Sequence, residues 1–117
     1  MVEDDDMLRK ALKMEFQGSF RTLAAADAAA ALFLADNADD LVAVVSDFEL
    51  GDGANGVELL AQVRSQRPKM ARVLVTAGSS ANTAIGTALS GGTVLAVVEK
   101  PWKLGELCKL VESLIDR

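Results

Sequence analysis

Asp47 is the residue of this sequence that best combines a reactive side chain with a position suited to chemistry. It follows the apolar run Leu41-Val-Ala-Val-Val-Ser46 and precedes a loop rich in Gly, Asp and Asn. An unbroken apolar run is typical of a strand covered on both faces, as in a parallel sheet. Ligands bind at the carboxyl ends of such strands, which makes Asp47 a candidate reactive carboxylate. A capping or turn aspartate is the alternative, because Asp is common at such junctions.

Three more apolar segments end on polar residues, namely Glu3 with Asp4, then Thr76, and finally Lys100. The ends of parallel strands open on one edge of a sheet, so we expect these side chains to converge with Asp47 in one pocket. Each signal is weak when taken alone. Thr76 also fits a simple strand-end β-former, and Lys100 also fits a solvated surface lysine; the ordered set of four is the stronger indication.

A pocket with three acids, one hydroxyl and one ammonium group suggests phosphoryl chemistry. Clustered carboxylates repel one another unless a cation neutralises them. Oxygen ligands without His or Cys favour Mg²⁺, which keeps waters that a phosphate oxygen can replace. A carboxylate beside such an ion can attack phosphorus and form an aspartyl phosphate. Lysine and threonine can then hold the remaining phosphoryl oxygens.

Composition bounds the class of protein. The 117 residues predict one domain, residues 1–117, and a hydrophobic content of 50% argues against disorder. The net charge is −5 and no Lys/Arg run occurs, so the footprint of nucleic-acid or anionic-membrane binding is absent. The sequence contains no His, which excludes serine-type triads and His-ligated zinc. Cys108 is the single cysteine and suits a reducing cytosol, and the sequence shows neither a membrane span nor a signal peptide. We therefore expect a soluble cytoplasmic module.

Periodicity predicts strands alternating with helices, and hence right-handed βαβ units around a parallel sheet. After the stub that ends at Glu3 and Asp4, the expected strands are 20–24, 41–46, 72–76 and 94–98. The expected helices are 7–16, 57–67, 82–89, 103–116 and one that Asp27 caps and that runs to about Asn37.

Several side chains are expected in the core. Leu32 and Phe33 are the largest buried candidates of the alanine-rich helix, and Cys108 lies on the apolar face of the last helix. That face also carries Leu104, Leu107, Val111 and Leu114. Trp102 fits either a packing anchor or an exposed partner contact.

With these motifs assembled, the chain resembles the receiver domain of bacterial two-component response regulators, the chemotaxis-regulator-like family. The resemblance covers nearly the whole chain. It implies a three-layer αβα, flavodoxin-like doubly wound parallel sheet with strand order 2-1-3-4-5 and a shortened first strand. The implied roles are a phosphoacceptor, a switch hydroxyl, a lysine before a typically cis proline, and metal ligands. The phosphoacceptor falls on Asp47, the switch hydroxyl on Thr76 and the lysine on Lys100. The implied metal ligands are Asp4, Asp47 and the Glu49 carbonyl, with Glu3 in the outer sphere.

The resemblance implies a phosphoacceptor in a phosphorelay. A sensor histidine kinase or a His phosphotransfer protein would supply the phosphoryl group to Asp47 with Mg²⁺, and the chain would signal to an unknown output protein or domain. No nucleic acid or membrane partner is implied for this domain, which would be a monomer or a phosphorylation-dependent dimer. Self-phosphorylation from a phosphodonor and slow autodephosphorylation would be its only reactions, so it would not be an enzyme in the usual sense.

Three departures from the family pattern accompany the resemblance. The first strand is a stub, and its loss would expose two strand edges. The loop 49–56 lacks the usual Met-Pro, and Val97 stands where the family usually has an aromatic switch residue.

Two other classes of protein stay open. A phosphorylation-independent pseudo-receiver is argued against by the intact acceptor set, and a haloacid-dehalogenase-type phosphatase would need aspartate where Glu49 stands.

Overall fold

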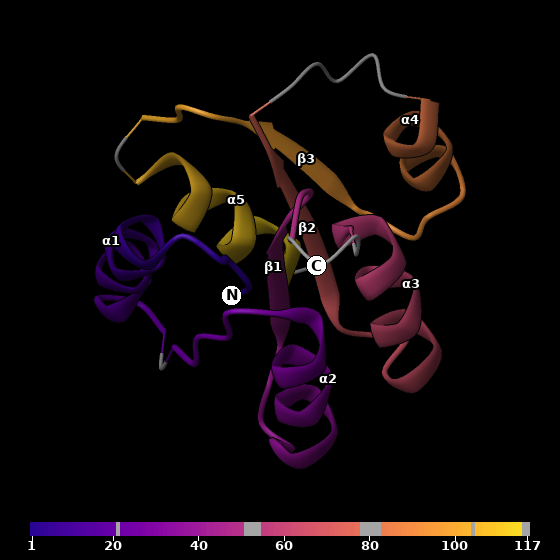
Figure 1. Cartoon of the computed structure of the whole chain (residues 1–117), viewed down its shortest axis with the longest axis horizontal. Coiled ribbons are helices and arrows are strands. Elements are labelled where there is room, and N and C mark those ends of the chain that lie inside the picture. Colours follow the sequence, from indigo (N-terminus) through magenta and orange to yellow (C-terminus); the bar gives the residue numbers. More distant parts are fainter. Residues whose placement is uncertain (21, 51–54, 78–82, 104, 116–117) are drawn as a thin grey trace.

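The computed structural model describes residues 1–20, 22–50, 55–77, 83–103 and 105–115, which form a parallel sheet with helices on both faces (Figure 1). The strands are β1 (Ala43–Asp47), β2 (Ala71–Thr76) and β3 (Ala96–Glu99). The helices are α1 (Asp6–Gln17), α2 (Ala28–Asn37), α3 (Gly56–Gln66), α4 (Thr83–Ser90) and α5 (Glu106–Ile115). No helix among these residues is long and apolar enough to cross a membrane.

The three regular strands are parallel and lie in the order β1-β2-β3. Ala43 pairs with Ala71 at the start of the first ladder, and Thr76 pairs with Glu99 at the end of the second. Two isolated parallel bridges extend the sheet beyond β1, since Val2 pairs with both Ser46 and Ala25. The spatial order is thus Ala25, Val2, β1, β2, β3, which confirms the predicted order 2-1-3-4-5 and the flavodoxin-like fold.

The first strand is even shorter than predicted, because Val2 alone occupies its place. The N–H of Val2 donates to the Val45 carbonyl at 2.7 Å, and the N–H of Asp47 donates to the Val2 carbonyl at 3.0 Å. On the other side, the N–H of Glu3 donates to the Ala25 carbonyl at 3.0 Å. Val2 therefore bonds to β1, while the residues on either side of it bond to Ala25.

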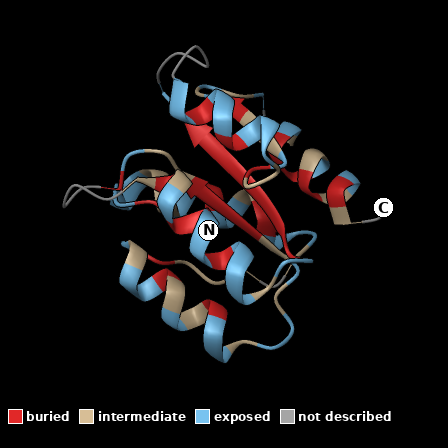
Figure 2. Cartoon of the chain, turned by 90° about the vertical axis from the view of Figure 1, so that its right-hand side faces the viewer, coloured by how far each residue is buried: buried red, intermediate tan, exposed pale blue. Residues whose placement is uncertain are grey.

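Two hydrophobic clusters sandwich the sheet. One lies under α1 and α5 and includes Phe16, Val73 and Leu107; the other lies under α2, α3 and α4 and includes Leu60 and Leu74, among further residues. Figure 2 shows the strands buried and the outer faces of the helices exposed. This three-layer arrangement follows from unbroken apolar runs in the strands and amphipathic patterns in the helices.

Most element predictions are confirmed within a few residues, but the strand predicted over residues 20–24 is wrong. Among the described residues of that range none is in a strand, and only the following Ala25 forms a bridge. The cause is the neighbouring first-strand position. It pairs with this segment at Ala25 through a single bridge, so a longer second strand has no regular ladder to join. The last helix starts later than predicted, after Gly105, whose φ of +84° is left-handed and interrupts helical geometry. Asp116 and Asn82 lie outside the described residues.

The prediction that Phe33 is buried is wrong, since 68% of this residue is exposed. The alanines at Ala31 and Ala35 face inward instead, one turn apart, and let α2 lie close to the sheet. Leu32 is half-buried, and Asp27 caps α2 as predicted by accepting from the N–H of Ala30 at 2.8 Å. Leu107, Cys108, Val111 and Leu114 are buried as predicted, whereas Leu104 lies outside the described residues.

Arg72 is a buried cation in the middle of the fold and only 4% exposed. Its guanidinium donates to the carbonyls of Thr93 (2.8 Å), Gly92 (3.0 Å), Met70 (2.8 Å) and Pro68 (3.1 Å). It thereby ties the turn that precedes β2 to the turn that precedes β3. Burial, followed by the charge of Arg64, lowers the pKa of Arg72 from its usual value.

Replacing Arg72 by Met should lower the free energy of unfolding by about 2–4 kcal/mol, because several buried carbonyls lose a charged donor. Urea denaturation measures the change. Arg64→Met is the matched control, since the exposed Arg64 gives a single bond to the Gly91 carbonyl and should cost about 1 kcal/mol or less. Equal losses in the two variants would show that Arg72 does not anchor these turns.

Candidate functional site

Lys100 joins two of the predicted acids at the carboxyl edge of the sheet. Its Nζ lies 3.2 Å from Glu3 Oε1 and 3.2 Å from Asp47 Oδ1. Lys100 directly follows β3, Asp47 ends β1, and Glu3 follows the single-residue strand at Val2. Residues nearly one hundred positions apart in the sequence thus meet because parallel strands end on the same edge.

The third acid completes a carboxylate cluster. Ligand oxygens of Glu3, Asp4 and Asp47 all lie within 4.8 Å of one another. Glu3 is buried, Asp47 is half-buried and Asp4 is exposed, so the cluster opens toward solvent on the Asp4 side. The backbone carbonyl of Glu3 accepts from Arg9 at 2.9 Å, and Arg9 also pairs with Asp6 in the first turn of α1. The start of α1 therefore fixes the chain immediately beside the two acids.

Gly56 allows the chain to return close beneath Asp47 after the loop. Its N–H donates to the Phe48 carbonyl at 2.7 Å, and Asn55 caps α3 by accepting from Glu58 at 2.9 Å. A Cβ on Gly56 would collide with the backbone carbonyl of Asp47 and lie 2.7 Å from Leu74 Cδ1. Glycine is thus required for the close approach of α3 to the end of β1. Sequence reasoning did not single out Gly56, although a glycine directly before a predicted helix is a recognisable signal.

The electrostatics of the cluster are dominated by Glu3. Burial and the neighbouring Asp47 carboxylate raise the pKa of Glu3 from 4.5 to about 7, against the opposing influence of Lys100. Burial acts to lower the pKa of Lys100, but its contacts with Asp47 and Glu3 outweigh burial and raise it. Without further positive charge, one lysine is shared between carboxylates, and the buried acid tends to keep its proton.

The residues present fit a divalent cation. Glu3 Oε2 is buried and accepts no hydrogen bond from any described residue, and such an orphaned oxygen calls for a donor or a cation. The donor set consists of carboxylate oxygens, which suit a hard ion such as Mg²⁺. The cluster is therefore an acidic group that could hold a metal ion, and a cation there would oppose the burial and the neighbouring charge of Asp47, which together raise the pKa of Glu3.

The other predicted residues lie in, or shortly after, the strands that end at this edge of the sheet. Thr76 is the last residue of β2, is 3% exposed, and accepts from the N–H of Lys100 at its carbonyl (2.8 Å). Glu49 is exposed and forms an isolated bridge with Asn55, on the far side of a loop whose residues 51–54 lie outside the described ones. The Lys100–Pro101 peptide is cis. Val97 is half-buried and packs against the hydrophobic cluster under α2, α3 and α4.

The segment after Lys100 is held by a residue that sequence reasoning missed. Both carboxylate oxygens of Glu15, on α1, accept hydrogen bonds, one from Trp102 Nε1 at 3.0 Å and one from the N–H of Gly105 at 2.7 Å. Trp102 is half-buried and packs against the cluster under α1 and α5, so it is a packing anchor. An isolated glutamate on an amphipathic helix carries no signal in the sequence that would identify such a contact.

Comparisons with known proteins agree with this architecture. A family model described as response regulator receiver domain matches residues 1–112. A CheY-like receiver domain protein from Methanospirillum hungatei is 22% identical with a TM-score of 0.88, covering 98% of this chain and 90% of that one. The signal receiver domain of an HD domain-containing protein from Pseudomonas fluorescens is 24% identical with a TM-score of 0.86, covering 98% and 90%.

A third structure is the non-phosphorylated HemR receiver domain from Leptospira biflexa. It is 26% identical to this chain with a TM-score of 0.84, and the match covers 99% of this chain and 91% of that one. No curated protein matches the chain.

Replacing Gly56 by Ala should lower the free energy of unfolding by about 1–3 kcal/mol, because the new Cβ meets backbone rather than a side chain that could move aside. Gly86→Ala is the matched control. Gly86 lies within α4 with no atom near its missing Cβ, so alanine there should stabilise the protein by about 0.5–1 kcal/mol. Chemical denaturation of both variants gives the comparison; a harmless Gly56→Ala would contradict the close approach.

The raised pKa of Glu3 predicts a pH dependence of stability in metal-free buffer. Between about pH 4.5 and 7 the folded protein keeps a proton on Glu3 that the unfolded chain releases. Stability from this group is therefore complete below pH 4.5 and is lost as the pH rises through about 7. Melting temperatures in EDTA should show this slope in the parent, and Glu3→Gln should flatten it. The control Asp36→Asn removes an exposed carboxylate of α2 and should leave the slope unchanged.

Proposed function

The chain belongs to the response regulator receiver domain family, and we propose that it accepts a phosphoryl group on Asp47 from a histidine kinase or a His phosphotransfer protein. The observation that carries this proposal is the contact of Lys100 with both Asp47 and Glu3 at the open edge of the sheet. We also propose that residues 1–117 form one receiver domain.

Asp47 is suited to act as the nucleophile. Its carboxylate is half-buried at the end of a strand, so it is held in place yet reachable from solvent. In the transfer, one carboxylate oxygen of Asp47 forms a bond to phosphorus while the bond between phosphorus and the donor's imidazole nitrogen breaks. The electron pair of the broken bond returns to the imidazole, which then takes up a proton. Slow attack of water on the acyl phosphate regenerates the Asp47 carboxylate and inorganic phosphate.

Lys100 has two tasks in this proposal. Its ammonium neutralises part of the charge that clustered carboxylates present to an incoming anion. Since its contacts with the acids raise its pKa, it stays charged over the working pH range and can hold a phosphoryl oxygen. The hydroxyl of Thr76, at the end of the neighbouring strand, would hold another phosphoryl oxygen and report its presence.

Mg²⁺ is the proposed cofactor. Asp4, Asp47 and the carbonyl of Glu49 would hold it directly, with Glu3 acting in the outer sphere. When bound, the ion would neutralise charge on the carboxylates and on the phosphoryl oxygens. The three clustered acids and the orphaned Glu3 oxygen support a cation at this place.

Signalling would then depend on contacts between proteins. A kinase or phosphotransfer protein upstream and an output protein or domain downstream are the proposed partners, in the cytoplasm. Val97 is half-buried and stiff at χ1, so it offers no large ring that could swing into space vacated by Thr76. We propose that the readout uses displacement of the backbone after Thr76 rather than rotation of an aromatic side chain.

Incubation with acetyl phosphate and Mg²⁺ should add one phosphoryl group, detected by intact-mass spectrometry. Asp47→Asn should abolish the addition, and EDTA should suppress it in the parent, because the nucleophile or the neutralising ion is missing. Asp36→Asn is a control that removes an exposed carboxylate of α2 and should leave the yield unchanged. A parent protein that takes up no phosphoryl group under these conditions would instead support a pseudo-receiver that signals without phosphorylation.

A further inference from the structure

Glu15 on α1 holds two points of the segment that follows Lys100. One of its carboxylate oxygens accepts from Trp102 Nε1 at 3.0 Å, and the other accepts from the N–H of Gly105 at 2.7 Å. The two donors lie 87 and 90 positions further along the chain. One half-buried carboxylate thus cross-links α1 to the chain that leads from β3 to α5.

The position of Glu15 is unfavourable for α1 itself and favourable for α5. Glu15 lies in the last turn of α1, where the negative end of the helix dipole disfavours an acid and where no basic residue offsets it. Gly105 directly precedes α5, whose positive dipole end attracts an anion. Gly105 has a φ of +84° and no side chain of its own that could accept there. The carboxylate on α1 therefore serves the start of α5 rather than the end of its own helix.

The other hydrogen bonds of the described residues between Lys100 and α5 are local. The N–H of Glu106 donates to the Lys103 carbonyl at 2.9 Å, which shapes the turn but reaches no other element. Trp102 also packs against the hydrophobic cluster under α1 and α5, but apolar packing has no direction of its own. In the described part of the chain, Glu15 is thus the polar anchor that ties this segment to another element.

Lys100 lies between two fixed points of the main chain. On one side, its own N–H donates to the Thr76 carbonyl at 2.8 Å. On the other side, Glu15 holds Trp102, two residues further on. The Lys100 side chain leaves the backbone between these points and reaches two carboxylates of the acidic cluster, each at 3.2 Å. Because a lysine side chain is long and flexible, the place of its ammonium group depends on how firmly the backbone is held at its root.

We propose that Glu15 is a positioning residue for Lys100. This inference rests on the proposed function, in which the ammonium of Lys100 holds a phosphoryl oxygen on Asp47. Glu15 makes no hydrogen bond to the acidic cluster in the described part of the chain and acts through Trp102 and Gly105. Misplacing a group by about 1 Å can slow a reaction by about a hundredfold. The flexible lysine recovers part of such a loss, so removing Glu15 should slow phosphorylation by about tenfold.

Two substitutions at Glu15 test this proposal on the whole chain. Glu15→Ala removes both acceptors and should slow phosphorylation by acetyl phosphate at saturating Mg²⁺ by about tenfold. Glu15→Gln keeps one carbonyl oxygen, which can accept one of the two bonds, so its rate should lie between those of the parent and of Glu15→Ala. Intact-mass spectrometry at successive times gives the rates, at a temperature well below the melting transition of every variant.

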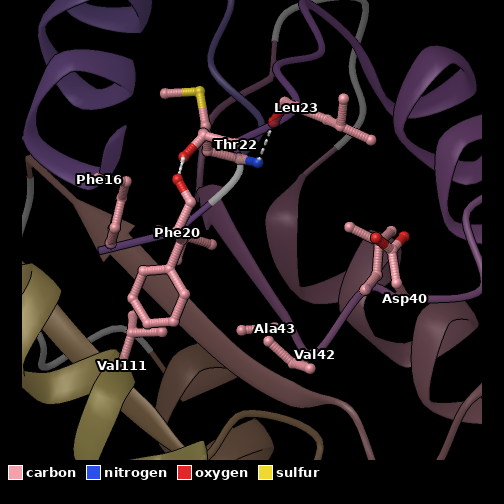
Figure 3. A pocket seen from close by; sticks show the side chains of 11 residues that line it. Phe16, Phe20, Thr22, Leu23, Asp40, Val42, Ala43 and Val111 are labelled. Carbon is pink, nitrogen blue, oxygen red and sulfur yellow. Dashed lines mark hydrogen bonds between the residues drawn. The ribbon is translucent and has the colours of Figure 1, made fainter. Parts of the chain in front are cut away.

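Val111→Ala is the matched control for a loss of stability. Val111 is a buried residue of α5 that lines, together with Phe16 and Ala43, a cavity of about 80 Å³ near the start of β1 (Figure 3). Truncating Val111 should lower the melting temperature. Lys100 follows β3 at the opposite edge of the sheet, so the rate should stay that of the parent. Equal losses of rate in Val111→Ala and Glu15→Ala would assign the effect to stability and overturn the proposal.

A second measurement does not depend on phosphorylation. NMR of lysine-labelled protein detects the Cε methylene of Lys100, and Lys100→Arg assigns its signal. Since two carboxylates hold this side chain, its signal should lie apart from those of exposed lysines in the parent and in Val111→Ala. In Glu15→Ala it should move toward them.

The two measurements separate this proposal from the proposed function. An unchanged Lys100 signal in Glu15→Ala would overturn the positioning role, and so would an unchanged rate in a protein that is phosphorylated. A parent protein that takes up no phosphoryl group would contradict the proposed function instead. The Lys100 signal would then still decide whether Glu15 positions this lysine.

Discussion

The repulsion among closely spaced carboxylates is the constraint around which the upper edge of this fold is arranged. Glu3, Asp4 and Asp47 present oxygens within 4.8 Å of one another, and Glu3 is withdrawn from solvent. One lysine, Lys100, partly offsets this repulsion through two contacts of 3.2 Å. A buried carboxylate without full compensation keeps its proton, as the raised pKa of Glu3 records. The site is thus poised for added positive charge, which a cation can supply.

Backbone hydrogen bonds hold these groups together against their repulsion. Val2 is bonded to β1, its neighbours Met1 and Glu3 are bonded to Ala25 on the other side, and Lys100 is tied to the end of β2 by its own N–H. Gly56 lets α3 begin directly against the carbonyl of Asp47. Because the anchors are main-chain groups at strand ends, the side chains of the acids and of Lys100 are not needed to hold the strands together. The architecture places the site, and the side chains determine its chemistry.

The sequence predicted the parts of this structure that depend on local pattern. Unbroken apolar runs located β1 and β2, and the charged residues that end or follow three apolar segments, among them Asp47 and Lys100, located the cluster that the structure brings together. Prediction failed where the outcome depends on neighbours. The described residues of 20–24 have the composition of a weak strand but lie in no regular strand, and Phe33 faces solvent because the smaller Ala31 and Ala35 fit closer to the sheet. Contacts such as that of Glu15 with Trp102 depend on tertiary geometry that no spacing in the sequence encodes.

The upper end of the first-strand position places the acidic residues, whereas its lower end belongs to the hydrophobic core. At the upper end, the bonds of Val2 to β1, of Glu3 to Ala25 and of Arg9 to the Glu3 carbonyl hold the two acids beside Asp47. At the lower end, near the start of β1, apolar side chains such as Leu23 and Leu41 line cavities. Cavities of this kind cost stability in proportion to the contacts that their walls lose. The cost falls on the core rather than on the geometry of the acidic cluster, because the bonds of Glu3, Asp47 and Lys100 in the described part of the chain run between strand ends away from these cavities. The positions of the acids and of Lys100 therefore depend on main-chain bonds at the strand ends rather than on packing at the start of β1.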